Sequence, residues 1–344
     1  MTSSVRRKEH LAGAAPTTTP LLELQQLETS FPTPRGLVRA VDGISLKVHA
    51  GECVGIVGES GSGKSVLVRT VMNLLPPTAV LGAQSRVLLD GEDLASLSPQ
   101  RRKHLWGPEL AMVFQDPMTS LNPVRRVGDQ IADPQRFHLG RSRKEARESA
   151  VELLTQVGIS EPQRRLDQYP HELSGGMRQR VMIAIALACE PRVLIADEPT
   201  TALDVTVQRQ ILELLRGLQR DRGMAMVLIT HDLGVVAGHT DRVAVMYAGR
   251  LVESAPTRVL FGEMGHRYTE ALFRSTPRVE QPTHSRLEVI AGRPPDLVAL
   301  PAGCRFAPRC THAVERCATD LPQLEPQAHE HLLACHNPVA RKAS

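Results

Sequence analysis

One short stretch limits the possible folds of this chain more than any other. Residues 58–65 read Gly-Glu-Ser-Gly-Ser-Gly-Lys-Ser and fit the pattern G-x-x-x-x-G-K-[ST]. An apolar run of strand type, Cys53 to Val57, precedes this loop, and apolar residues at helical spacing, Val66 to Leu75, follow it. Because strand, glycine loop and helix occur in the order that a phosphate loop requires, the sequence predicts an α/β fold with a P-loop NTPase core.

The residue types of the loop match the chemistry of a nucleotide phosphate site. Glycines allow the backbone to turn several N–H groups toward one anion, and the start of the following helix adds its positive end. Lys64 is expected to reach the β- and γ-phosphates, and the Ser65 hydroxyl to bind Mg²⁺. The residues assigned to nucleotide binding here are Gly58, Ser60, Gly61, Ser62, Gly63, Lys64 and Ser65.

Polar side chains follow three later apolar runs of strand type. Asp197 and Glu198 end one such run, Gln115 ends another and His231 ends a third. Asp197 is predicted to hold Mg²⁺, and Glu198 to act as the general base that polarises the attacking water. Gln115 would touch Mg²⁺ or that water, and His231 the γ-phosphate. Seen alone, each has a plainer interpretation, as a solvent-facing turn residue or a structural histidine.

A second helix start has the same physical character as the phosphate loop. Ser174 is a natural N-cap for a helix over Met177 to Ala188, and Gly175 and Gly176 follow it directly. One domain holds one triphosphate, already assigned to Lys64. The second start is therefore predicted to serve a nucleotide held by another subunit, and a capped helix with a glycine turn is the alternative.

Composition narrows the class of protein. The formal net charge of +4 over 344 residues, without a lysine or arginine block, argues against a nucleic-acid-binding surface. The most apolar segment, Val181 to Cys189, is far shorter than the ~20 residues that span a bilayer. Residues 1–20 lack the apolar core of a secretion signal and are expected to be a disordered leader. These features predict a cytoplasmic protein that docks on a membrane.

The order of segments suggests subdomains. Residues 21–48 are expected to form two strands joined by a turn, with Phe31 in that loop, where it would stack on adenine or pack on the core. Residues from about 117 to 181 are predicted to be a helical insertion in the α/β domain. Beyond residue 258 the sequence is rich in proline and histidine and has too little apolar periodicity for a large core of its own.

Taken together, residues 21–258 resemble the ATP-binding cassette (ABC) ATPases. Leu173-Ser-Gly-Gly-Met177 is similar to their signature motif, with methionine in place of the usual glutamine. Gln115 then matches the Q-loop, Ala202-Leu203-Asp204 the D-loop, His231 the switch histidine and Phe31 the adenine-stacking aromatic. The resemblance implies an added antiparallel β subdomain and a head-to-tail pair of subunits. Each ATP would lie between one phosphate loop and the Ser174, Gly175, Gly176 and Asp204 of the other subunit.

A narrower resemblance connects the chain with the oligopeptide/dipeptide importers. It rests on Gln115 to Pro123, Ser174 to Arg180, His266 to Ala271 and Gly303 to Cys310, although Arg267 stands where that family usually has proline. This implies an ATPase that works with a second ATPase subunit as a heterodimer, two membrane permease subunits and an extracytoplasmic peptide receptor. The same machinery importing another solute, such as nickel, and a soluble ABC protein without a transport role are the alternatives.

Four cysteines gather in the predicted C-terminal extension, residues 259–344. Cys304, Cys310, Cys317 and Cys335 have the spacing C-x5-C, C-x6-C, then seventeen residues, which fits neither common zinc-ribbon nor ferredoxin spacing. Chemically, four thiolates suit zinc or a 4Fe–4S cluster equally, with His312 or His336 as substitute zinc ligands, and free thiols are the alternative. The importer resemblance implies the 4Fe–4S cluster. Cys53 and Cys189 lie in apolar runs and are expected to be buried as small hydrophobes.

Overall fold

Five parallel strands form the centre of the main sheet. The computed structural model describes residues 19–201, 203–275, 289–328 and 330–340. The parallel strands are β3 (Cys53–Val57), β7 (Leu110–Val113), β8 (Val193–Asp197), β9 (Ala225–Thr230) and β10 (Arg242–Tyr247). They lie in the order β10-β3-β9-β8-β7. Their residues are almost all buried because helices cover both faces, which explains the unbroken apolar runs in the sequence.

A second, antiparallel sheet packs beside the first. Its main strands, β1 (Leu22–Thr33) and β2 (Gly36–Val48), pair along nearly their whole length. The short strands β4 (Val80–Leu81), β5 (Arg86–Leu89) and β6 (Glu92–Asp93) complete it. The expected two-strand unit is present, but Phe31 lies within β1 and pairs with Val38, so its predicted place in the loop is wrong. The strand runs to Thr33 because the tight turn needs only two residues.

Helices fill the faces of the main sheet. Helix α1 (Lys64–Val71) packs between the two sheets, and α8 (Val205–Arg222) and α9 (Leu233–His239) cover β9 and its neighbours. Helices α10 (Thr257–Gly262) and α11 (Arg267–Arg274) follow the closing hairpin of β10 and β11 (Arg250–Pro256). The short helix α2 (Pro99–Leu105) follows the 3-10 turn η1 (Leu94–Ser96), and a second 3-10 turn, η2 (Pro170–Glu172), comes just before α7.

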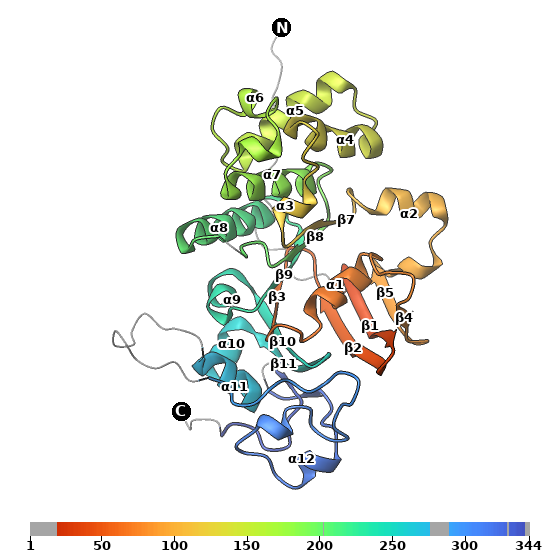
Figure 1. The fold of residues 1–344 in the computed structure, drawn as a ribbon, viewed down its shortest axis with the longest axis vertical. Coiled ribbons are helices and arrows are strands. Elements are labelled where there is room, and N and C mark those ends of the chain that lie inside the picture. The colour runs from red at the N-terminus through yellow and green to blue at the C-terminus, as the bar shows by residue number, and fades with distance from the viewer. Residues whose placement is uncertain (1–18, 202, 276–288, 329, 341–344) are drawn as a thin grey trace.

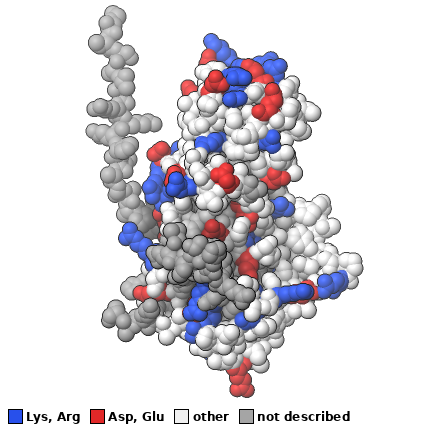
Figure 2. Space-filling model, turned by 60° about the vertical axis from the view of Figure 1, so that its left-hand side comes forward, with Lys and Arg blue, Asp and Glu red and all other residues white. Residues whose placement is uncertain are grey.

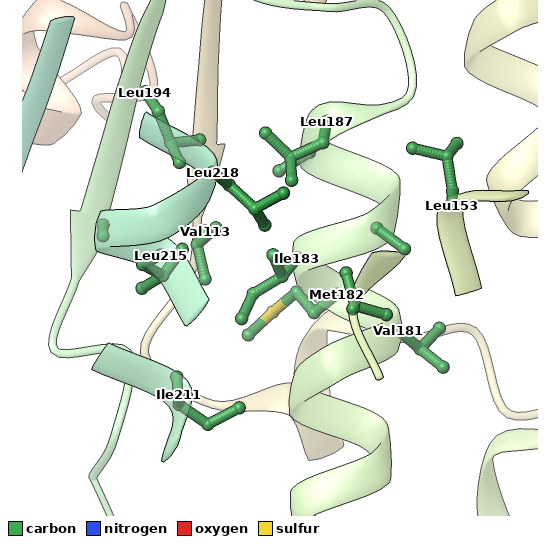
Figure 3. Close-up of a cluster of buried hydrophobic side chains, with 14 of the residues drawn as sticks. Val113, Leu153, Val181, Met182, Ile183, Leu187, Leu194, Ile211, Leu215 and Leu218 are labelled. Carbon is green, nitrogen blue, oxygen red and sulfur yellow. The ribbon is translucent and has the colours of Figure 1, made fainter. Parts of the chain in front are cut away.

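A helical subdomain occupies one end of the molecule (Figure 1). It consists of α3 (Pro117–Ser120), α4 (Val127–Leu139), α5 (Arg143–Gln156), α6 (Pro162–Arg165) and α7 (Gly175–Leu187). Ser142 and Glu145 close a capping box at the start of α5. Figure 3 shows α7 between Leu153 of α5 on one side and Leu215 and Leu218 of α8 on the other. The helix that begins with the Ser-Gly-Gly turn therefore joins the subdomain to the sheet through one continuous core.

The C-terminal extension lies at the opposite end and is built onto the main sheet (Figure 1). Its described elements are η3 (Ala307–Arg309), α12 (Arg316–Thr319), β12 (Glu325–Pro326) and β13 (Leu332–Leu333). Strand β13 pairs antiparallel with β11, which continues the main sheet into the extension. The fully buried Glu253 of β11 accepts hydrogen bonds from the backbone N–H groups of Gly265 and His266 and contacts the His331 ring at 2.7 Å. The extension thus shares its core with β10 and β11, as its weak periodicity suggests.

The surface charges are mixed in sign, as the small net charge of the sequence predicts. In Figure 2, basic and acidic side chains are mixed over the visible face of the helical subdomain. Arg126 and Arg147, for example, both pair with Asp167. Within the described ranges, no helix has the length and apolar character that crossing a bilayer demands. The leader predicted for residues 1–20 falls almost entirely outside the described residues, which begin at residue 19.

Candidate functional site

The phosphate loop connects the end of β3 to the first residue of α1. Gly61 and Gly63 adopt φ values of 77° and 102°, in the left-handed region that favours glycine. A Cβ atom at Gly63 would lie 2.1 Å from the carbonyl oxygen of Ala40, so backbone contact as well as conformation demands glycine there. The loop consequently curls tightly at the carboxyl end of a central strand, where α/β sheets bind ligands.

Lys64 is held inside this loop. Its side chain is 4% exposed, and its Nζ donates to the carbonyl oxygens of Gly58 at 2.7 Å and Glu59 at 3.0 Å. Burial lowers the pKa of Lys64, and the carboxylates of Glu198 and Asp197 oppose that shift. The Lys64 amine is therefore pre-positioned in the loop, with acidic groups beside it that favour its charged form.

Two oxygen donors suited to Mg²⁺ meet beside the lysine. The Ser65 hydroxyl donates to Asp197 Oδ1 at 3.3 Å, and the Asp197 side chain is almost completely buried at the end of β8. Burial raises the pKa of Asp197, and the Ser65 hydrogen bond, Arg69 and Lys64 lower it. Mg²⁺ in nucleotide sites commonly takes one or two protein oxygens and completes its shell with phosphate oxygens and water. The hydroxyl and carboxylate fit such a cation.

Glu198 is the point at which the other predicted catalytic residues converge. Its Oε2 accepts hydrogen bonds from Gln115 Nε2 at 3.0 Å and from Thr201 Oγ1 at 2.9 Å. Its Oε1 lies 3.5 Å from His231 Nδ1. The backbone of Glu198 has φ 44°, an uncommon conformation for a residue with a side chain. Such strain concentrates at functional sites, and here it directs the carboxylate toward the phosphate loop.

An open cavity of about 740 Å³ lies over these groups. Its floor is the phosphate loop with Gln115, Glu198 and His231, and one wall carries Phe31, Val38 and Ala40 from the antiparallel sheet. Phe31 thus lines the same cavity as Lys64, and its stacking on adenine stays a prediction. Leu272 of α11 and Leu297 of the extension also line the cavity. Neither was identified from the sequence, because nothing near either residue indicates a nucleotide.

The Ser-Gly-Gly turn lies elsewhere. Ser174 is exposed at the start of α7, where its Oγ caps the helix by accepting from the Met177 N–H at 3.3 Å. Asp204 similarly caps α8 through the N–H groups of Thr206 and Val207. Among the described residues that line the Lys64 cavity, neither Ser174 nor Gly175, Gly176 or Asp204 is present. Ala202, in the predicted D-loop, falls outside the described residues.

Comparisons with known proteins agree with this geometry. A family model described as "ABC transporter" matches residues 41–201, and one described as "Oligopeptide/dipeptide transporter, C-terminal region" matches residues 252–317. The dipeptide transport ATP-binding protein DppD of Bacillus subtilis is 47% identical over 92% of this chain and 94% of its own length. This chain belongs to the ABC transporter ATP-binding proteins.

Other members of the family reinforce the assignment. The oligopeptide transport ATP-binding protein OppD of Salmonella typhimurium is 47% identical over 93% of this chain and 94% of its own length. A solved ABC cassette, a dimer in a post-hydrolysis state bound to ADP and Pi, matches with a TM-score of 0.61 and 28% identity. That match covers 69% of this chain and 99% of the cassette. The cassette fold, the ATPase class and the ABC family predicted from the sequence are confirmed.

The four cysteines of the extension lie near one another: beyond the effect of burial, the Cys317 and Cys335 thiols raise the pKa of Cys304, and those of Cys310 and Cys317 raise the pKa of Cys335. Among the residues that the structure describes, no group of three or more His, Cys, Asp or Glu side chains is arranged to hold a metal ion. The predicted 4Fe–4S or zinc site at Cys304, Cys310, Cys317 and Cys335 is therefore not supported. Cys304 and Cys310 pack against the apolar cluster around Phe306, and burial raises the pKa of Cys304 to about 11. Cys53 and Cys189 are buried as expected.

Besides Leu272 and Leu297, sequence reasoning missed three further residues of this ABC site. Thr201 holds the Glu198 carboxylate and stands three positions after it, so its spacing was a usable signal. Glu59 lies inside the loop pattern at a position where any residue is allowed. Arg309 forms an ion pair with Glu59 from 250 residues away. A contact of such separation leaves no local pattern in the sequence.

Proposed function

We propose that this chain is the ATP-hydrolysing subunit that powers import of di- and oligopeptides through separate membrane subunits. The observation that carries the proposal is the convergence of Gln115, Thr201 and His231 on Glu198, beside Lys64 and the Ser65–Asp197 pair. The peptide substrate rests on the matched C-terminal region and on relatives named for dipeptide and oligopeptide transport.

The chemistry assigns one step to each group. The Walker A amides and Lys64 bind the β- and γ-phosphates, and Mg²⁺ held through Ser65 and Asp197 would neutralise charge on them. Water attacks the γ-phosphorus, the bond to the β–γ bridging oxygen breaks, and the Glu198 carboxylate takes the proton of the water. Gln115 and Thr201 orient that carboxylate. His231 lies on the other side of it, where the γ-phosphate would bind.

We further propose that the site is completed by a second cassette, in a heterodimer that docks on membrane permeases at the cytoplasmic face. Exposed Ser174, remote from the Lys64 cavity of its own chain, supports this arrangement, and so does the dimeric state of the related cassette. In this arrangement Ser174, Gly175, Gly176 and Asp204 would contact the nucleotide of the partner. An extracytoplasmic receptor would deliver the peptide.

Ser174→Arg tests the shared site directly. The variant keeps its own Walker A loop, so its affinity for ATP should stay within about twofold of wild type. Its ATPase activity in the assembled transporter should fall at least about tenfold, because the bulky cation blocks the partner's nucleotide. Val80→Arg, at an exposed position of β4 in the antiparallel sheet, is the matched control for a new surface charge. Full activity of the Ser174 variant would contradict the shared site.

The substrate class is tested on the purified assembly. The tagged chain is isolated with its membrane subunits, and ATP hydrolysis in proteoliposomes is measured with receptor plus dipeptide, a pentapeptide mixture, or Ni²⁺. Stimulation by peptides alone is expected. Stimulation by Ni²⁺ alone would favour the nickel alternative, and recovery of the chain without membrane subunits would favour a soluble ABC protein.

We propose residues 21–258 as the ATPase domain and 259–344 as its extension. We also propose that the four cysteines of the extension hold a metal centre, a 4Fe–4S cluster or zinc. The support for the metal centre is proximity: the Cys317 and Cys335 thiols each raise the pKa of Cys304. The iron, sulfide and zinc contents of protein purified without oxygen test the proposed metal centre. A stoichiometric 4Fe–4S absorption spectrum is the expected result, and metal-free protein with full ATPase activity would overturn it.

A further inference from the structure

Arg309 of the extension grips the phosphate loop. Its Nη1 donates to Glu59 Oε2 at 2.6 Å and its Nη2 to Glu59 Oε1 at 3.0 Å, a bidentate pair. The Arg309 side chain is only 4% exposed. Its guanidinium also lies 3.3 Å from the Tyr247 hydroxyl, and its Nε donates to the carbonyl oxygen of Ala291 at 3.0 Å. The pair is therefore partly buried, with the arginine side enclosed and fixed in orientation by further contacts.

The carboxylate of Glu59 is unusual because it lies beside the site for the negatively charged triphosphate of ATP. Glu59 is the second residue of the loop, it lines the ATP cavity, and its carbonyl oxygen accepts from Lys64 Nζ. Its N–H donates to the Tyr268 hydroxyl at 2.8 Å, so the backbone of Glu59 faces the loop and the α11 region at once. An uncompensated carboxylate here would repel the triphosphate at close range. Arg309 is the cation that compensates it.

Other residues of the extension contact the same side of the nucleotide site. Leu297 lines the ATP cavity, and its carbonyl oxygen accepts from the Arg39 N–H at 3.1 Å. Pro294 and Pro295 lie against the loop residues between Glu59 and Ser62 in a small adjoining pocket. The segment from 290 to 309 thus forms an outer wall of the nucleotide site, with Arg309 as its charged contact.

We propose that Arg309 is a positioning residue for ATP: by pairing with Glu59 it cancels the charge of that carboxylate and fixes the phosphate loop, so the C-terminal extension sets nucleotide affinity. The proposal rests on the ATP site of the proposed function and adds the extension to it. Arg309 touches no substrate in this arrangement; it acts through Glu59.

A double-substitution cycle on the full chain tests the pair. Arg309→Met should raise the KM for MgATP about tenfold and change kcat by less than about twofold, because it exposes the Glu59 charge to bound and transition states alike. The KM of Arg309→Lys, which keeps the charge but loses the two-pronged guanidinium, should lie between those of wild type and Arg309→Met. Adding Glu59→Gln to Arg309→Met should restore the KM to that of Glu59→Gln alone, because the repelling charge is gone.

Arg267→Met is the matched control. Arg267 also anchors the extension, donating to the carbonyl oxygens of Asn337 and Pro338, but it does not reach the phosphate loop. An equal rise in KM for the Arg267 variant would overturn the proposal, since loosening the extension would then suffice. Additive effects of the Arg309 and Glu59 substitutions would overturn it too.

Hydrogen exchange without nucleotide separates this inference from the proposed function. The amides of residues 58–65 should exchange several-fold faster in Arg309→Met than in wild type or Arg267→Met, because the loop loses its clamp. Unchanged exchange in Arg309→Met would overturn the clamp whatever the kinetics show. Absence of ATP binding in the wild-type protein would instead refute the proposed function.

Discussion

At the scale of single residues, the hydrogen bonds around Glu198 decide what the site can do. A carboxylate that accepts from Gln115 and Thr201 and lies beside His231 has its position set before any water arrives. Its left-handed backbone is kept by the bond from its own N–H to the carbonyl oxygen of Ile229 at 3.0 Å. Preorganised acceptors of this kind act on the transition state without further rearrangement.

Glu198→Gln tests this residue. The amide keeps the shape of the side chain but no longer accepts a proton, so phosphate release should fall about 10²-fold or more. MgATP should still bind with near wild-type affinity, because Lys64, Ser65 and Asp197 are intact. Bound ATP and steady-state phosphate release are both measured, and multiple turnovers near the wild-type rate would remove Glu198 from the mechanism.

At the scale of elements, α7 links the helical subdomain to the main sheet. Its first turn is the exposed Ser-Gly-Gly motif, whereas its later residues fill the core between the helical subdomain and the main sheet (Figure 3). The sequence predicted a helical insertion over about residues 117–181, but α7 continues to Leu187 and packs on β7 and β8. The helix that carries Ser174 is therefore held by contacts with both parts.

Ile183→Ala measures how much the packing of α7 contributes to the stability of the fold. Ile183 is fully buried among residues of α7 and α8, so truncation leaves a cavity and should lower the free energy of unfolding by about 2–5 kcal/mol. Val205→Ala, which removes methyl groups from an exposed side chain, should cost less than about 0.5 kcal/mol. Urea unfolding of both variants makes the comparison, and equal midpoints would deny α7 this role.

At the scale of the whole molecule, the extension joins the cassette through buried polar groups as well as apolar ones. His266 caps α11 by accepting from the Tyr268 N–H at 2.9 Å and lies among Glu253 and the β13 region. Burial lowers the pKa of His266 to about 4, although Glu253 opposes the shift. The ring is therefore neutral at neutral pH.

This burial predicts how stability depends on pH. The unfolded chain binds a proton on His266 near pH 6.5 and the folded chain only near pH 4, so His266 makes the protein less stable as the pH falls between these values. The loss amounts to about 3 kcal/mol at most. His266→Asn keeps a helix cap and should remove this component, as unfolding at pH 7.5, 5.5 and 4.5 would show. A variant with the same pH dependence as wild type would contradict the assignment.

Features that depend on residues close together in the sequence were predicted, and features that depend on distant residues were not. The phosphate loop, the two carboxylates, the glutamine and the switch histidine were all predicted, because each depends on a few consecutive residues after an apolar strand. The antiparallel unit was also predicted, yet Phe31 lies in β1 itself, since turn length could not be read from the Pro-rich stretch. A metal site at the four cysteines stays a prediction, because spacing alone cannot show whether thiols bind a metal or pack as hydrophobes.

By itself the sequence determined that this protein binds a nucleoside triphosphate, since backbone conformation and phosphate chemistry confine that task to one contiguous loop. Only the tertiary structure decided which distant groups complete the site: Gln115 meets Glu198 across 83 residues, and Arg309 meets Glu59 across 250. Parallel strands bring their carboxyl ends to one edge, and the β11–β13 pairing attaches the extension to the side of the same sheet. Such meetings depend on sheet order, which no local pattern records.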